Sequence, residues 1–372
     1  MKVACIFHQM TYFNVSMNRR ESVKMENEAA RVFEKLLRDI PRLEMMQVER
    51  EAAIGRDEHV DIIVTAHYAD KPLTFVIEVK SNGQPRMMQS AALQLKHYID
   101  GQDDDFVPVV MAPYMSALAR DVCRREGVGY VDFLGNAHIA VDTIFIDRQV
   151  AERPKPERRA LRSLFKPKSA RILRTLLHDP HRSWRVAELA EEAKVSIGHV
   201  STVGSALRER GWAEMRGAGL TLTDPDDLLE SWADSYEPPK GEEIRRYSHL
   251  QGKALADRLR SLPMGGGRAV LASYSAADWL APYVRQQTTY LYADEAGFNA
   301  LASGLDLAPA AKGANVVVRI PDEDGVLDDV VEVSDGIFAT SPVQTYLDLM
   351  SAGERGQEGA QHLRAKLLEW KA

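Results

Sequence analysis

The chain has 372 residues, of which 45% are hydrophobic and 27% charged, and its formal net charge is −7. A chain of this length is expected to form two or three domains, each large enough to bury its own core. The only two cysteines exclude a disulfide framework and a Cys-rich zinc site. No apolar run approaches the length of a membrane span, so we expect a cytoplasmic protein that makes no membrane contact.

The charge is unevenly distributed along the sequence. Residues 1–147 carry 17 Lys and Arg against 22 Asp and Glu, residues 148–219 carry 16 against 8, and residues 220–372 carry 14 against 24. The middle segment therefore has a net charge of +8 between two acidic blocks. Positive charge at this density attracts a phosphate backbone, which indicates double-stranded DNA as a partner.

Two apolar runs in the N-terminal block, residues 61–64 and 75–80, have the composition of strands. Successive side chains of a strand point to opposite faces, so Glu78 and Lys80 emerge on the same side. Asp61 opens the first run, and pairing of the two strands can bring its carboxylate beside Glu78. The alternative is an ordinary solvated strand, because an E-x-K triplet arises often by chance.

The oxygen ligands that such a pair of strands would gather suit a hard cation. The carboxylates of Asp61 and Glu78 and the carbonyl of Val79 are donors of the type that Mg²⁺ or Mn²⁺ prefers. Lys80 would stabilise the charge that develops on a phosphate, or orient an attacking water. The pattern indicates metal-assisted phosphodiester hydrolysis, with Mg²⁺ or Mn²⁺ as the cofactor if the site is active.

The same residues, in this order, resemble the PD-(D/E)xK nuclease superfamily. Gln94 and Tyr98 lie four residues apart on a predicted helix, share a face, and resemble the Q-x-x-x-Y element of the RecB-like branch. The resemblance implies a restriction-endonuclease-like α/β domain over residues 1–147, with Glu28 on the first helix as an additional acidic residue. The implied catalytic set is Glu28, Asp61, Glu78, Lys80, Gln94 and Tyr98.

Residues 148–168 are expected to form a basic linker, because residues 152–159 are polar and interrupted by proline. Three short helices and a hairpin follow: one from Ser169, a second over residues 185–193, a third from Ser196 to about Arg210, and strands up to Thr223. Ser196 is a suitable N-cap for the third helix. This order, over residues 169–225, resembles a winged helix-turn-helix.

In that fold the helix after the turn enters the major groove, and small polar side chains let it approach the base edges. The residues expected to face bases are Ser196, His199, Ser201, Thr202 and Ser205, and those expected to reach phosphates are Arg185, Arg208 and Arg216. Winged helices also serve as protein–protein modules, which leaves an alternative open.

Residues 240–372 are expected to form a further α/β domain, with strands near 269–271, 290–292 and 316–320. The three glycines at 265–267 precede a strand and lack a following Lys-Ser/Thr, so they predict a turn and not a phosphate-binding loop. No catalytic constellation is evident in this domain.

Two stretches resemble AbiEi-type antitoxins of type IV toxin–antitoxin systems: Gly129–Ala137, with the pattern Y-x-D-x-x-G-N, and residues 343–360, which include Y-x-D-L. The resemblance implies an autorepressor that counteracts a nucleotidyltransferase-like toxin without requiring a tight complex. In contrast to that family, about 150 residues precede the winged helix here. For Asp132 and Asn136 a turn with capping side chains is the simpler interpretation.

The sequence thus predicts an α/β multidomain protein and leaves three functions open. A DNA-binding regulator or antitoxin would use the basic segment and retain the nuclease-like domain as a scaffold. A Mg²⁺-dependent endonuclease would be targeted to DNA by its winged helix. An interaction protein would require neither activity. Because operator half-sites are normally read by twofold dimers, we also expect a homodimer, with the acidic C-terminal domain as the source of pairing.

Overall fold

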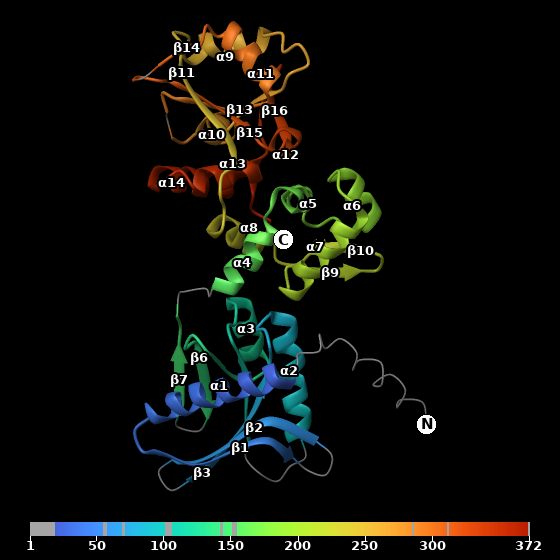
Figure 1. Ribbon diagram of the computed structural model, residues 1–372, viewed down its shortest axis with the longest axis vertical. Helices are drawn as coiled ribbons and strands as arrows, with labels where there is room; N and C mark the ends of the chain where they lie inside the picture. The colour runs from blue at the N-terminus through green and yellow to red at the C-terminus, as the bar shows by residue number, and fades with distance from the viewer. Residues whose placement is uncertain are drawn as a thin grey trace. The chain divides into compact units, whose positions relative to one another are not determined.

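The computed structural model describes residues 19–54, 58–68, 71–100, 106–141, 144–150, 155–284, 286–310 and 312–370. The chain divides near residue 155 into two compact units (Figure 1). Both combine helices with β-sheet, which confirms the expected α/β multidomain class. None of the helices in these ranges has the length and apolar character of a membrane span.

The N-terminal unit is built on a seven-stranded sheet whose strands follow one another in chain order. These are β1 (Leu43–Ile54), β2 (Glu58–Tyr68), β3 (Lys71–Val79), β4 (Phe106–Ala112), β5 (Gly129–Asp132), β6 (Ala137–Val141) and β7 (Ile144–Arg148). Strands β3, β4 and β5 are parallel, and the remaining neighbours pair antiparallel. The carboxyl ends of β3, β4 and β5 therefore meet at one edge.

Helices cover both faces of this sheet. Helix α1 (Arg19–Arg38) places Phe33 and Leu37 at helical spacing against one face, where Phe33 meets Phe75 edge-on at 5.2 Å between ring centroids. Helices α2 (Pro85–Ile99) and α3 (Ala117–Arg125) pack on the other face, where Leu95 joins Val76. Neighbouring residues of β3 thus belong to two different cores, as the strand period requires.

The second unit begins with a helix where the sequence predicted a linker. Helix α4 (Lys155–Leu164) buries Leu161 and Leu164, which are 2% and 6% exposed, in a core with Trp212 and Trp232. The proline-broken appearance was misleading because Pro156 lies in the first turn, where a missing N–H costs no helical hydrogen bond. The expected basic linker over residues 148–168 is therefore wrong for this stretch.

The three helices and the hairpin expected after it are present. They are α5 (Pro167–His178), α6 (Val186–Glu192), α7 (Ile197–Glu209), β9 (Ala213–Arg216) and β10 (Gly219–Leu222), with β8 (Trp184–Arg185) between α5 and α6. The three strands form an antiparallel sheet in the order β8-β10-β9. Arg185 lies in β8 and not at the start of the second helix, because Trp184 and Arg185 pair with β10.

Helix α8 (Pro225–Asp234) leads into a second seven-stranded sheet with the order β14-β11-β15-β13-β12-β17-β16. Its strands are β11 (Gly241–Tyr247), β12 (Ala269–Leu271), β13 (Thr289–Ala293), β14 (Ala308–Pro309), β15 (Val316–Pro321), β16 (Val330–Ser334) and β17 (Ile337–Thr340). The helices are α9 (Gly252–Ser261), α10 (Ser273–Leu280), α11 (Glu295–Gly304), α12 (Gly325–Asp328), α13 (Pro342–Met350) and α14 (Glu354–Leu367). Strands β12, β13 and β15 occupy the positions expected from the sequence.

One hydrophobic core crosses the domain boundary predicted at residues 225–240. Leu173 of α5, Leu207 of α7 and Trp232 of α8 belong to the same buried cluster as Tyr346 of α13 and Leu363 of α14. Residues 155–372, apart from a short segment, accordingly form a single compact unit. The composition change that suggested two domains reflects surface charge, whereas the buried side chains are continuous.

Candidate functional sites

The pairing of β2 with β3 places the two predicted carboxylates on one face. The antiparallel register sets Ile62 opposite Ile77, so the next step sets Asp61 opposite Glu78, and opposite residues share a face. Oδ2 of Asp61 also accepts a 2.7 Å hydrogen bond from the backbone N–H of Val79. The strand ends are thus held together at the predicted site.

A chain of polar contacts connects four of the predicted catalytic residues. Lys80 Nζ lies 2.5 Å from Oε1 of Glu78, whose side chain is buried, and 3.5 Å from Oε1 of Gln94. Nε2 of Gln94 donates to the Tyr98 hydroxyl at 2.6 Å. Spacing of four residues on α2 brings the last two onto one face, as expected.

Glu28 lies apart from this chain of contacts. Its side chain is 52% exposed and forms a 3.8 Å ion pair with Arg31. The acidic residue on the sheet-facing side of α1 is Glu26, which is 8% exposed and accepts a 2.9 Å hydrogen bond from the Ser22 hydroxyl. Glu26 precedes the buried Phe33 by seven residues and therefore shares its face.

The oxygen donors around β3 fit a hard divalent cation in kind. Asp61 and Glu78 supply carboxylates, and the Val79 carbonyl is the third predicted donor. Within the described residues, no three His, Cys, Asp or Glu side chains gather closely enough to hold an ion by themselves. A cation here would therefore need the Val79 carbonyl and water as further ligands. The carboxylate of Glu78 would also have to give up its contact with Lys80.

Asp132 and Asn136 form the capping turn that the sequence indicated. Asp132 is fully buried, and its Oδ1 accepts hydrogen bonds from the backbone N–H groups of Leu134, Gly135 and Asn136 at 2.9–3.0 Å. Its Oδ2 accepts from the N–H of Met115 at 3.1 Å and from Nδ2 of Asn136 at 2.7 Å. These contacts tie the end of β5 to the segment that follows β4.

Helix α7 turns its apolar stripe inward, as the sequence predicted. Val200, Val203 and Leu207 are buried, and the hydroxyl of Ser196 accepts the N–H of His199 at 3.3 Å, which confirms the N-cap. The ring of His199 is half-buried, with Nε2 3.2 Å from the hydroxyl of the buried Ser169 on α5. His199 thus contacts α5, a role that helical periodicity alone does not show.

The other predicted base-facing residues lie on the exposed side of α7 or at its edge. Ser201 donates to the carbonyl of Ile197 at 3.1 Å, and Thr202 donates to that of Gly198 at 3.0 Å. Ser205 is half-buried. Ile197, at the first position of α7, is 58% exposed although it is apolar, and the buried stripe of the helix begins only at Val200.

The three predicted phosphate contacts differ in exposure. Arg185 on β8 and Arg216 on β9 are exposed, and Arg216 pairs with Glu214 at 2.6 Å. Arg208 is half-buried, with Nη2 3.4 Å from the Ser205 hydroxyl. Arg208 lies on α7, Arg216 on the β9–β10 hairpin, and Arg185 on β8, which pairs with β10.

A buried polar cluster connects α5 with α13 and is centred on Asp348, the aspartate of the Y-x-D-L stretch. Oδ1 of Asp348 accepts hydrogen bonds from the hydroxyls of Tyr236 and Tyr292, at 2.5 and 3.0 Å, and from Nε2 of Gln344 at 3.0 Å. Arg174 of α5, 5% exposed, donates to Oε1 of Gln344 at 3.0 Å. Burial raises the pKa of Asp348 to about 6, and its hydrogen bonds oppose part of that rise.

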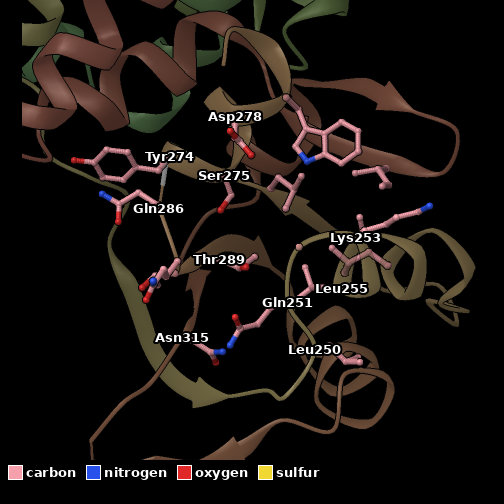
Figure 2. A pocket seen from close by; sticks show the side chains of 18 of the residues that line it. Leu250, Gln251, Lys253, Leu255, Tyr274, Ser275, Asp278, Gln286, Thr289 and Asn315 are labelled. Atoms are coloured by element: carbon pink, nitrogen blue, oxygen red, sulfur yellow. The ribbon is translucent and has the colours of Figure 1, made fainter. Parts of the chain in front are cut away.

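A pocket of about 630 Å³ lies between α9, α10 and the start of β13. Figure 2 shows Asp278 and Ser275 on one side and Gln251 and Asn315 on the other, with Thr289 between them. Apolar side chains from α9, β12 and β17 complete the lining. Amides and hydroxyls over an apolar floor are typical of ligand-binding pockets.

The C-terminal part of the chain is similar to a known protein family. Residues 221–369 match the family model described as "Transcriptional regulator, AbiEi antitoxin, Type IV TA system". The predicted resemblance to AbiEi-type antitoxins is therefore confirmed over these residues, which begin within β10. No curated protein matches the chain.

Solved structures show a weak likeness to this chain. EndoMS in its apo form is 17% identical, with a TM-score of 0.20 over 28% of this chain and 44% of that one. A repair endonuclease from Pyrococcus abyssi is 17% identical, with a TM-score of 0.23 over 32% and 48%. An EndoMS–dsDNA complex is 20% identical, with a TM-score of 0.22 over 32% and 46%. This chain spans less than half of each, and TM-scores this low carry no argument about function.

Proposed function

We propose that this protein is a DNA-binding transcriptional regulator that acts as an AbiEi-like antitoxin and represses its own promoter. The observation that carries the proposal is the order of elements along the chain, α5-β8-α6-α7-β9-β10, together with the antiparallel β8-β10-β9 sheet. This order is typical of a winged helix-turn-helix, in which α7 would enter the major groove. The family match over residues 221–369 supports the regulatory role.

The electrostatics of this region support contact with duplex DNA. Residues 148–219 carry a net charge of +8 in a chain whose net charge is −7. Arg185 and Arg216 are exposed on the strands that flank α7. Each phosphate that such side chains neutralise releases counterions, so affinity should fall steeply as the salt concentration rises.

A mobility-shift titration on the protein's own promoter region tests the proposal. The wild type should retard the fragment, and the double variant R208E/R216E should not. The matched control is R258E/K366E, which makes the same change in charge at exposed positions of α9 and α14. Equal loss in both variants, or affinity that does not depend on salt, would show that α7 and its hairpin are not the DNA interface.

The antitoxin role is tested separately from DNA binding, with the full-length protein. Co-expression should relieve the growth arrest caused by a nucleotidyltransferase-like toxin encoded next to this gene. Because antitoxins of this type counteract the toxin without requiring a tight complex, absence of co-purification does not count against the role. Failure to relieve growth arrest, with DNA binding intact, would leave a regulator without antitoxin activity.

A second candidate function is Mg²⁺- or Mn²⁺-dependent cleavage of DNA at the β2–β3 site. It is favoured by the chain of contacts from Glu78 through Lys80 and Gln94 to Tyr98, with Asp61 across the strand pair. A cation bound there would polarise the scissile phosphate. Lys80 would then stabilise developing negative charge, and Gln94 would position the substrate with Tyr98 beside it.

Plasmid cleavage with Mn²⁺ separates the two functions. If the site is active, D61A and K80A should lose cleavage by orders of magnitude. The control K96A removes an exposed lysine of α2 and should retain cleavage. Equal cleavage by all variants would identify a contaminant. No cleavage by any protein would leave the nuclease-like unit as a scaffold.

A further inference from the structure

The side of α7 that faces away from the core is small, hydroxylated and apolar. Ile197, Gly198, Ser201 and Thr202 recur at spacings of three and four and are all exposed, while the opposite side is buried. The first two turns of α7, residues 197–204, contain no Arg, Lys, Asn or Gln. His199, the one ring in these turns, contacts Ser169.

The hydroxyls on this surface have intrahelical partners for their hydrogens. A serine or threonine hydroxyl has one hydrogen to donate and two lone pairs that accept. Ser201 and Thr202 donate their hydrogens to the carbonyls of Ile197 and Gly198 within the helix. While these bonds are kept, the outward lone pairs accept a hydrogen bond, and in the major groove that favours the amino group of adenine or cytosine.

Ile197 supplies the apolar part of the same surface. Its side chain is 58% exposed at the N-terminal end of α7, the end that contacts base edges in helix-turn-helix proteins. The apolar group that a base edge offers in the major groove is the 5-methyl group of thymine. Guanine presents two acceptors there, and its usual readers, Arg and Lys, are missing from these turns.

We infer that α7 reads A·T pairs, with Ile197 against the thymine methyl group and Ser201 or Thr202 accepting from the adenine amino group. This inference rests on the proposed DNA-binding function and specifies its base readout. A·T is the pair that offers a methyl group and an amino donor together in the major groove. The DNA that this protein recognises therefore contains A·T pairs at the positions α7 contacts.

The test uses the full-length protein and a duplex taken from the footprint on its own promoter region. Each thymine is replaced in turn by deoxyuracil, which removes only the 5-methyl group. Wild type should lose about fourfold in affinity at one or two positions, the value expected for one buried methyl group. I197A should bind the thymine duplex more weakly and lose no further affinity on the same replacements.

A matched variant and a set of distinct outcomes keep the inference falsifiable. L367A truncates another exposed apolar side chain, on α14, and should change neither affinity nor sensitivity to deoxyuracil. Specific binding that is indifferent to every deoxyuracil replacement would overturn the inference and leave the regulator intact. Sensitivity retained in I197A would assign the methyl contact to another residue. Absence of any specific binding would overturn the proposed function itself.

Discussion

Replacing Asp348 by asparagine should remove a specific part of the pH dependence of stability. The folded pKa of about 6 lies above the ordinary aspartate value of 3.8, because burial disfavours the charged carboxylate. Asp348 therefore contributes stability that is fully present below pH 3.8 and is lost as the pH rises through about 6. Tyr236 and Tyr292, which face it, have pKa values raised well above 10 and stay neutral in this range.

The expected size of the effect follows from the shift. The difference between the folded and the ordinary pKa corresponds to about 3 kcal/mol of stability lost between full protonation and pH 8, of which about 1 kcal/mol is lost between pH 5 and pH 8. Asparagine stays neutral and can retain the acceptor at Oδ1. Its amide nitrogen would occupy the place of Oδ2, which has no hydrogen-bond partner among the described residues, at a pH-independent cost of about 1–3 kcal/mol.

Tryptophan fluorescence during urea unfolding provides a selective assay, because all five tryptophans lie between residues 184 and 370 and so report on the second unit. The stability of D348N relative to wild type should rise by about 1 kcal/mol between pH 5 and pH 8, because only the wild type loses stability as Asp348 ionises. D335N, at an exposed position, should run parallel to wild type. If the wild-type and D348N curves also run parallel, the carboxylate of Asp348 does not titrate as argued.

Three further measurements follow from the structure. Leu161→Ala should destabilise the second unit by about 2–5 kcal/mol, because the side chain is buried. A negligible effect would show that α4 does not contribute to the core and acts as a linker. Burial raises the pKa of the Cys123 thiol to about 12, so in a Cys5→Ser variant it should react with a thiol reagent only on unfolding, and rapid reaction of the folded protein would contradict that burial. Light scattering of the full chain should give twice the chain mass of 41.6 kDa, and a monomeric mass would exclude the proposed homodimer.

Much of the N-terminal site was predictable because it depends on local periodicity. Alternation along a strand places Glu78 and Lys80 together, and spacing of four on a helix aligns Gln94 with Tyr98. Two acidic residues stand two positions apart on α1, and packing distinguishes them: Glu26 is buried on the face of Phe33, whereas Glu28 is exposed.

The parts that sequence did not show depend on tertiary contacts. The partner of His199 is Ser169, thirty residues away, and the hydrogen bonds of Asp348 come from three separate elements. Charge and proline content suggested a linker and a second boundary, but neither property reports which side chains are buried. Leu161 and Trp232 reveal the continuous core only once the helices are assembled.

The core that α5–α8 share with α10, α13 and α14 has a consequence for how proteins of this kind diversify. Gene recombination preserves folding where few contacts cross the junction, and here that position is near residue 155. A crossover at residues 225–240 would leave two fragments, each exposing leucines and aromatic rings from the divided core. The helices proposed to bind DNA and the region that matches the antitoxin family should therefore be inherited together, while the N-terminal unit can be gained, exchanged or lost separately.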